Sequence, residues 1–252
     1  MPHDVALFVT CLTDQFYPQV GVAVTKILER LGCRVHFPQA QTCCGQPFFN
    51  NGFPDQARPL AERFVEIFEP YQYVVTPSGS CAAMVREQYE VLLKDDPAFA
   101  HGMHAVVAKT YEFVEFLDKV LKVDLSQLKL PTAAPEPVTY HYTCHLRGIG
   151  VKDEGVRLLK QIGNVDYRPM EKVDQCCGFG GTFAVKYPAI SGAIVEDKVD
   201  CIAKTEAKTL ICNDAGCSMN ISGMCNRSGV EVRTKHIAEL MADAMGIDTA
   251  GW

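Results

Sequence analysis

The sequence predicts an α/β protein with two similar halves, each built on a parallel sheet and related by internal duplication. A pattern of four cysteines occurs twice along the 252 residues, and strand-like and helix-like segments follow in the same order around both copies. The stretch 129–137 contains three prolines and lies between the copies, as expected of a linker. We therefore expect one repeat domain at 1–128 and a second at 138–252.

The repeated pattern places eight of the twelve cysteines at matching positions. Each copy has one cysteine, 31 intervening residues, an adjacent cysteine pair followed by glycine, and a final cysteine. The members are Cys11, Cys43, Cys44 and Cys81 in the first copy, and Cys144, Cys176, Cys177 and Cys217 in the second. Identical spacing around two such pairs predicts two soft-metal sites, or one site shared between the halves.

The segments before each cysteine pair follow one order. A β-rich run ends at the first cysteine, an apolar-periodic stretch predicts a helix, and a short strand leads into a loop rich in Gly, Gln and Pro. The expected ranges are 5–10, 18–31 and 33–37 in the first half, and 138–143, 151–162 and 165–168 in the second. This alternation predicts parallel sheets with the cysteines at the carboxyl ends of strands, where open α/β sheets build their sites.

The segments after each pair also correspond. A second helix is expected to bury an apolar face, made by Ala57, Leu60, Ala61, Phe64, Ile67 and Phe68 in one half and by Ile190, Ala193, Ile194, Cys201 and Ile202 in the other. A third strand at 73–76 or 209–212 precedes the last cysteine, which stands where another helix starts. Helices at about 105–121 and 234–245 are expected to close the two halves.

Composition and charge narrow the class of protein. A net charge of −6 gives no reason to expect a nucleic acid or an anionic membrane surface as partner. The N-terminus lacks the basic and apolar regions of a secretory signal, and no apolar stretch approaches the roughly 18 residues of a membrane span. We therefore expect a cytoplasmic protein, where thiols stay reduced and many cysteines indicate metal or redox chemistry rather than disulfides.

The form of the pattern favours iron-sulfur clusters over zinc. Thiolates are soft ligands that suit both, but zinc sites usually use two cysteines separated by two to four residues, and the repeated cysteines contain no such pair. Adjacent cysteines in an extended loop point in different directions and can reach separate irons. Glycines such as Gly45 and Gly178 let the backbone approach a bulky inorganic core. The alternative is a set of buried free cysteines with ordinary glycine turns.

Other candidates carry weaker signals. Cys33 and Cys201 lack equivalents in the other half and are expected to be core residues, as is Cys225, two helical turns after Cys217. Cys212 ends a buried strand and is either core or a fifth ligand. His141 and His145, near Cys144, suggest a Cys–His nucleophile, but we favour residues that lie near a metal site without ligating it. The run Gly178-Phe-Gly-Gly181 lacks the full dinucleotide-binding fingerprint.

At these residues the chain resembles the cysteine-rich CCG family, which includes the cysteine-rich subunit of heterodisulfide reductase and the glycolate oxidase iron-sulfur subunit. The resemblance is strongest to the branch that acts in lactate utilisation, and it covers essentially the whole chain. The stretches that carry it are 8–11, 31–38, Cys43-Cys-Gly-Gln-Pro47, 78–81, Cys176-Cys-Gly-Phe-Gly-Gly-Thr-Phe183, 220–223 and 236–239.

The resemblance implies an iron-sulfur subunit of a cytosolic complex that oxidises L-lactate to pyruvate, carrying electrons in [4Fe-4S]-type clusters and inactive alone. It also implies a ferredoxin-like iron-sulfur protein and a third small subunit as partners. The ligands would be the eight repeated cysteines, as metal and cofactor-binding residues; catalytic residues are not identified. Where the heterodisulfide reductase subunit has a further cysteine, this chain has Ser78 or Asp214. That departure argues against disulfide-cleaving chemistry. An oxygen ligand from either residue, in place of the missing thiolate, is an alternative.

Two other functions compete with this one. A catalytic iron-sulfur subunit of the heterodisulfide reductase type would gain support if Cys212 restored a fifth thiol. A zinc-binding or structural protein without enzymatic activity is the third hypothesis, and it would contain neither iron nor sulfide.

Overall fold

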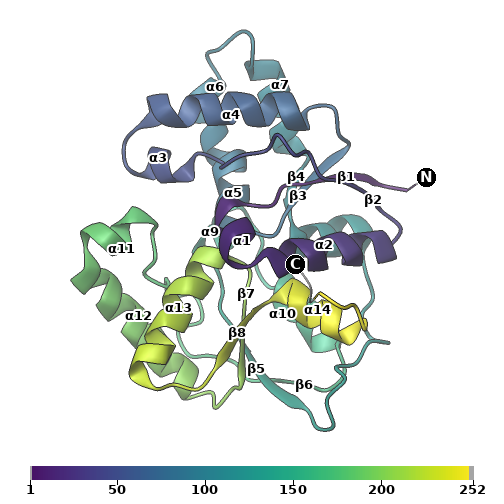
Figure 1. Cartoon of the computed structure of the whole chain (residues 1–252), viewed down its shortest axis with the longest axis vertical. Coiled ribbons are helices and arrows are strands. Elements are labelled where there is room, and N and C mark those ends of the chain that lie inside the picture. The colour runs from purple at the N-terminus through teal and green to yellow at the C-terminus, as the bar shows by residue number, and fades with distance from the viewer. Residues whose placement is uncertain (1, 250–252) are drawn as a thin grey trace.

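Two four-stranded parallel sheets, one from each half, form the frame of the molecule in the computed structural model, which describes residues 2–249 (Figure 1). The strands are β1 (Asp4–Leu7), β2 (Arg34–His36), β3 (Tyr73–Thr76) and β4 (Thr110–Glu112), then β5 (Glu136–Tyr140), β6 (Val165–Tyr167), β7 (Thr209–Cys212) and β8 (Arg233–His236). The strand orders are β2-β1-β3-β4 and β6-β5-β7-β8, so equivalent strands occupy equivalent places. The predicted pair of similar parallel α/β halves is confirmed.

Helices connect the strands and cover the sheets. The first half contains α1 (Cys11–Phe16), α2 (Pro18–Arg30), α3 (Gln46–Asn50), α4 (Pro54–Phe68), α5 (Gly79–Ala83), α6 (Tyr89–Leu93), α7 (Ala100–Ala108) and α8 (Phe113–Glu115), with π-helical segments η1 (Met84–Gln88) and η2 (Phe116–Leu121). The second contains α9 (Cys144–Gly148), α10 (Glu154–Gln161), α11 (Thr182–Lys186), α12 (Pro188–Ala203), α13 (Ala215–Ser228) and α14 (Ile237–Ala244). None of the helices between residues 2 and 249 is long and apolar enough to cross a membrane.

The strands at 73–76 and 209–212 have the predicted bounds, but the fourth strand of each half was missed. β4 interrupts the segment predicted as one helix at 105–121, and β8 occupies the start of the helix predicted at 234–245. Each strand has only three or four residues and is flanked by apolar residues at helical spacing. Its strand conformation comes from pairing with β3 or β7, which is a long-range interaction that local periodicity does not encode.

The predicted apolar face of α12 was partly wrong. Ile190 is 54% exposed, and Ala193 is also exposed. The helix instead turns Ser191, Val195 and Lys198 toward the interior. Because α12 carries apolar residues around much of its circumference, hydrophobic periodicity alone does not fix which side meets the sheet.

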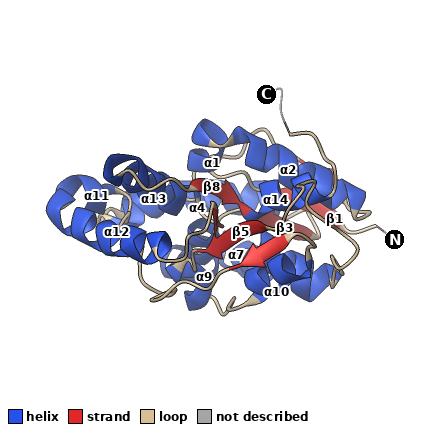
Figure 2. Cartoon of the chain, turned by 90° about the horizontal axis from the view of Figure 1, so that it is seen from below, coloured by secondary structure: helices blue, strands red, loops and turns tan. Residues whose placement is uncertain are grey.

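The two halves share one hydrophobic core. The largest cluster of buried residues joins Val24 and Ile27 of α2, Leu117 of η2, Leu159 of α10 and Ile237 of α14. In both views α2 lies against α14, although the two helices come from opposite ends of the chain (Figures 1 and 2). This shared core extends across the boundary between the two predicted repeat domains. The division into domains at 1–128 and 138–252 therefore stays a prediction.

Candidate metal centre

A cavity of about 330 Å³ between the two halves brings all eight repeated cysteines to one place. It lies beyond the carboxyl ends of the strands, where α5 of the first half packs against α9 of the second (Figure 1). Gln46, His145, Phe179 and the glycines that follow it also line the cavity. Sequence spacing predicted a four-thiol group in each half, and the fold places both groups on one cavity.

In the first group the adjacent cysteines reach different partners. The Sγ atom of Cys43 lies 3.7 Å from that of Cys11, and the Sγ atom of Cys44 lies 3.3 Å from that of Cys81. The backbone turns sharply at Gly45, which has a φ of 89° and whose amide donates to Cys43 Sγ over 3.5 Å. A side chain at this glycine would be strained and would press on the backbone of α4.

The second group repeats this arrangement. The Sγ atoms of Cys177 and Cys217 lie 3.0 Å apart, and the Gly178 amide donates to Cys176 Sγ over 3.3 Å. Gly178 has a φ of 80°, and a Cβ atom there would lie only 2.7 Å from the carbonyl oxygen of Ser191. The glycine after each pair is therefore required by both conformation and space.

Each group contains one thiol that ionises readily. The hydrogen bond from Cys11 lowers the pKa of Cys43 to about 3, and the hydrogen bond from Cys144 lowers that of Cys176 to about 2. The same bonds, together with burial, raise the pKa of Cys11 and of Cys144. Because the thiolate is the form that binds metals, both groups offer a ligand at neutral pH.

The thiols run from solvent to the interior in both halves. Cys11 and Cys176 are exposed, whereas the inner thiols of both groups are buried: Cys44, Cys81, Cys177 and Cys217. The twelve cysteines, all within residues 2–249, form no disulfide with one another. A group bound here would have one face toward solvent and one in a low-dielectric interior.

The oxygens of Ser78 and Asp214 join the halves to each other. Ser78 caps α5 by accepting from the Cys81 amide at 3.4 Å, and Asp214 caps α13 by accepting from the Gly216 amide at 3.1 Å. The Ser78 hydroxyl also donates to Asp214 over 3.1 Å, and so does the Ser80 amide over 3.0 Å. The side-chain oxygens of Ser78 and Asp214, which the sequence suggested as alternative metal ligands, are thus engaged in hydrogen bonds.

The four remaining cysteines separate into two kinds. Cys33, Cys201 and Cys225 lie in hydrophobic clusters, as packing residues do. Cys212 is also buried, but its Sγ lies in one group with that of Cys217 and a ring nitrogen of His141, all within 4.8 Å of one another. The sequence left the role of Cys212 open, and it favoured His141 as a residue that lies near the metal site without ligating the metal. The position of His141 three residues before Cys144 was the available signal.

His145 lies beside the cavity and reaches both halves. Its Nδ1 lies 3.7 Å from Cys144 Sγ, and its Nε2 lies 3.5 Å from Gln46 Nε2 of the first half. The Cys144–His145 pair has the contact that a Cys–His nucleophile would need. However, the hydrogen bond of Cys144 with Cys176, together with burial, raises the pKa of the Cys144 thiol, which disfavours the thiolate that such a nucleophile needs.

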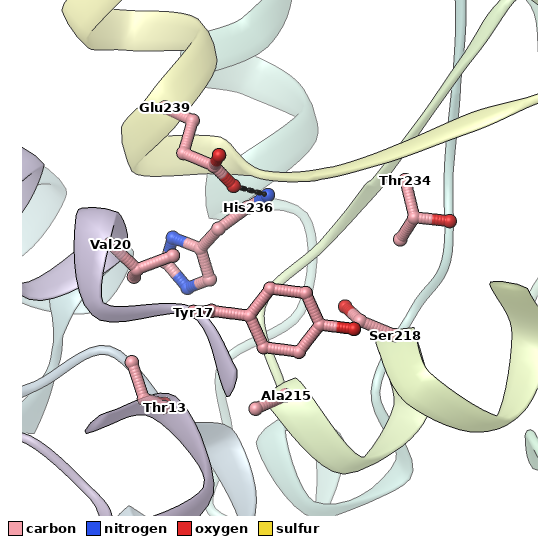
Figure 3. Close-up of a pocket in the computed structure, with 8 residues that line it drawn as sticks. All are labelled: Thr13, Tyr17, Val20, Ala215, Ser218, Thr234, His236 and Glu239. Carbon is pink, nitrogen blue, oxygen red and sulfur yellow. Dashed lines mark hydrogen bonds between the residues drawn. The ribbon is translucent and has the colours of Figure 1, made fainter. Parts of the chain in front are cut away.

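A second, much smaller cavity lies between α1–α2 of the first half and α13, β8 and α14 of the second (Figure 3). His236 and Glu239 form a capping box on α14, in which Glu239 accepts from the His236 amide over 2.7 Å. The Nδ1 atom of His236 accepts from the Ala238 amide over 3.1 Å, and burial lowers the pKa of this imidazole to about 4. The space measures about 10 Å³, which suits a single water molecule rather than a substrate.

Comparison with known proteins gives one family and one group of relatives. Residues 5–86 and 138–222 each match the family described as CCG, cysteine-rich domain. The chain is 44% identical over 239 residues to lactate utilization protein A of Anoxybacillus flavithermus, covering 94% of this chain and 98% of that protein. It is 46% identical over 238 residues to lactate utilization protein A of Geobacillus kaustophilus, with the same coverage.

Among solved structures, a hypothetical protein from Helicobacter pylori has a similar fold. The TM-score is 0.70 at 10% sequence identity, over 98% of this chain. This chain spans half the length of that protein. At such low identity the match supports the two-sheet architecture alone.

Proposed function

The chain belongs to the cysteine-rich CCG domain family, and from this premise we propose that it is an iron-sulfur subunit of a cytoplasmic complex that oxidises L-lactate to pyruvate. Relatives with 44% and 46% identity are named for lactate utilization, which supports this substrate. The structural observation that carries the proposal is the meeting of eight thiols at one cavity. The repeats at 1–128 and 138–252 would each supply one metal-binding half.

The donor set fits iron-sulfur clusters, which we propose to be [4Fe-4S] clusters, one in each half. The first would be held by Cys11, Cys43, Cys44 and Cys81, and the second by Cys144, Cys176, Cys177 and Cys217. Four thiolates are the usual ligands of such a cluster, and the lowered pKa of Cys43 and Cys176 gives each half an ionised thiol. The Gly45 and Gly178 amides, which point at thiol sulfurs, would balance negative charge.

The exposure of the thiols suggests how electrons reach the site. Clusters held by these cysteines would supply one-electron transfer. The exposed thiols of Cys11 and Cys176 mark the side on which a redox partner would approach, while Cys44 and Cys177 keep the inner side dry. Oxidation of a 2-hydroxy acid releases two electrons, so the chain would be inactive alone. We propose a ferredoxin-like iron-sulfur protein and a third small subunit as partners.

Metal and sulfide analysis tests the cofactor. Protein purified without oxygen should contain iron and acid-labile sulfide, and dithionite reduction should give an EPR signal. Stoichiometric zinc without sulfide under the same conditions would instead support the structural zinc hypothesis.

Growth tests the substrate. A strain that lacks this gene, and has no second copy, should grow poorly on L-lactate as sole carbon source and recover when the gene is restored. Restoration with the Cys44→Ser form should fail if the thiols are needed. Normal growth of the deletion strain would reject the lactate assignment and leave the cluster assignment intact.

One observation favours a second candidate, a heterodisulfide-reductase-like subunit that acts on disulfides. Cys212 lies near Cys217 and offers the second half a fifth thiol. Reduced protein that cleaves a mixed disulfide without added partners would support this candidate over electron transfer.

A further inference from the structure

The two thiol groups differ in the buried residues that stand behind them. Three equivalent positions show the difference, each defined by its place in the repeat. Phe8 and His141 lie three residues before the first cysteine of their halves. Thr76 and Cys212 end the equivalent strands β3 and β7. The third position is occupied by Phe64 in α4 and by Lys198 in α12, each the eleventh residue of its helix.

In the first half this wall is mainly apolar. Phe8 and Phe64 meet edge to face, with ring centroids 4.9 Å apart, and both are buried. Thr76 is fully buried beside them on β3. None of the three is a soft metal ligand, so the first centre has only its four repeated thiols.

In the second half the same wall carries side chains that are able to bind a metal ion. A ring nitrogen of His141 and the Sγ atoms of Cys212 and Cys217 lie within 4.8 Å of one another, and all three residues are buried. Both ring nitrogens of His141 lack a hydrogen-bond partner within residues 2–249. Leaving a buried polar group unpaired is costly, so a fully buried imidazole with two unpartnered nitrogens is suited to bind a metal ion.

A buried lysine adds a second, independent observation. Lys198 is fully buried, and its ammonium donates to the carbonyls of Lys172 at 2.8 Å and Val173 at 3.4 Å. These carbonyls belong to the loop that leads into Cys176 and Cys177. Neither acceptor carries a charge, and the ionisable groups that interact with Lys198 are, in decreasing order, Cys201, Asp174, Cys177 and Cys176. A buried cation beside thiols fits an anionic metal–thiolate centre.

We propose that His141, Cys212 and Cys217 together hold one metal ion of the second centre, so that this centre has a nitrogen ligand and a further thiolate that the first centre lacks. The inference rests on the proposed function in one respect, because the ion is taken to be an iron of the second centre. With three protein donors on one iron, this centre would depart from the four-thiolate [4Fe-4S] type proposed above. Donors around one metal, with bonds of about 2.0–2.3 Å, lie about 3–4 Å apart, so small rotations of these side chains would close the group.

The test separates the halves and looks for nitrogen bound to iron. The full chain carrying Cys43→Ser and Cys44→Ser would be labelled with ¹⁵N-histidine, supplied with iron and sulfide without oxygen, and reduced for pulsed EPR. We expect the strong nitrogen coupling of a directly bound imidazole. A chain carrying Cys176→Ser and Cys177→Ser, which keeps only the first centre, should lack it.

Two matched variants identify the ligands. His141→Phe and Cys212→Thr give the second half the residues of the first, so both are compatible with the repeat fold, and circular dichroism checks this. His141→Phe should abolish the nitrogen coupling, and Cys212→Thr should change the EPR g-values. Coupling that survives His141→Phe would assign the nitrogen to another histidine and overturn the proposal.

Other results distinguish failure of this inference from failure of the proposed function. Iron and sulfide in the second half without nitrogen coupling would overturn the inference and leave the function standing. Zinc bound by the second half in place of iron would also overturn it. Absence of iron and sulfide from both halves would reject the proposed function itself.

Discussion

Replacing Gly79 with alanine tests whether the two halves hold each other's thiol-bearing helices in place. Gly79 begins α5, which carries Cys81, and it packs against Leu146 of α9, which carries Cys144. A Cβ atom at residue 79 would lie 2.6 Å from Leu146 Cγ and 3.1 Å from its Cδ2. Because carbon atoms pack at about 3.5–4.0 Å, either the Leu146 side chain or one of the two helices must move by about 1 Å.

The expected cost follows from this overlap. Overpacking of a well-packed contact usually costs about 1–3 kcal/mol. For a chain of this size each kcal/mol corresponds to about 2–4 °C, so the Tm should fall by about 2–12 °C. The shift should also displace Cys81 relative to Cys144, and the iron content of protein purified without oxygen should fall.

The matched control is Gly223→Ala within α13, where a new Cβ atom meets nothing within 4 Å. Helix propensity should make that variant about 0.5–1 kcal/mol more stable. Circular dichroism melts of both variants, and of Gly79→Ala combined with Leu146→Ala, would be compared. The combined variant should lose less than the sum of its parts, because Leu146→Ala removes the clash. A Gly79→Ala protein as stable as the Gly223→Ala control would refute the reasoning.

Three further predictions concern single side chains. Replacing Cys44 or Cys177 with serine should remove the iron and sulfide of that half, because a hydroxyl is a weaker ligand than a thiolate. Cys201→Ala should keep the iron and sulfide and lower the free energy of unfolding by about 1 kcal/mol. Equal losses of metal in these variants would contradict the division into ligands and core cysteines. Tyr89→Phe should lower the free energy of unfolding by about 1–2 kcal/mol, because the buried hydroxyl of Tyr89 donates to the Cys44 carbonyl over 3.1 Å. Urea titrations would measure this change, and an unchanged free energy would count against the hydrogen bond. Burial lowers the pKa of His236 to about 4, below its ordinary 6.5, so its contribution to stability is complete above pH 6.5 and lost as the pH falls toward 4. That loss amounts to about 1.4 kcal/mol per pH unit. His236→Asn can still cap α14, and its free energy of unfolding, measured from pH 7 to 5, should depend less on pH by this amount. Parallel curves for the two proteins would show that His236 is not the group responsible.

Much of the architecture could be predicted because it is written in local patterns. The strands at 73–76 and 209–212 are β-rich runs ended by turn residues, and the structure has them at those bounds. The duplication was visible because the spacing of eight cysteines repeats, and the matching strand orders of the two sheets follow from it. Such features depend on residues close together in the chain, which composition and periodicity record.

The tertiary structure decided what depends on distant residues. β4 is a strand because β3 lies beside it, and α14, from the other end of the chain, packs against α2 and helps to bury its apolar face. Lys198 is buried although it is charged, and His141 meets Cys212 although about seventy residues separate them. The sequence by itself determined two similar halves with four thiols each. Only folding decided that both sets share one cavity and that the second has extra donors, because side chains meet through sheet pairing and helix packing, which local sequence does not encode.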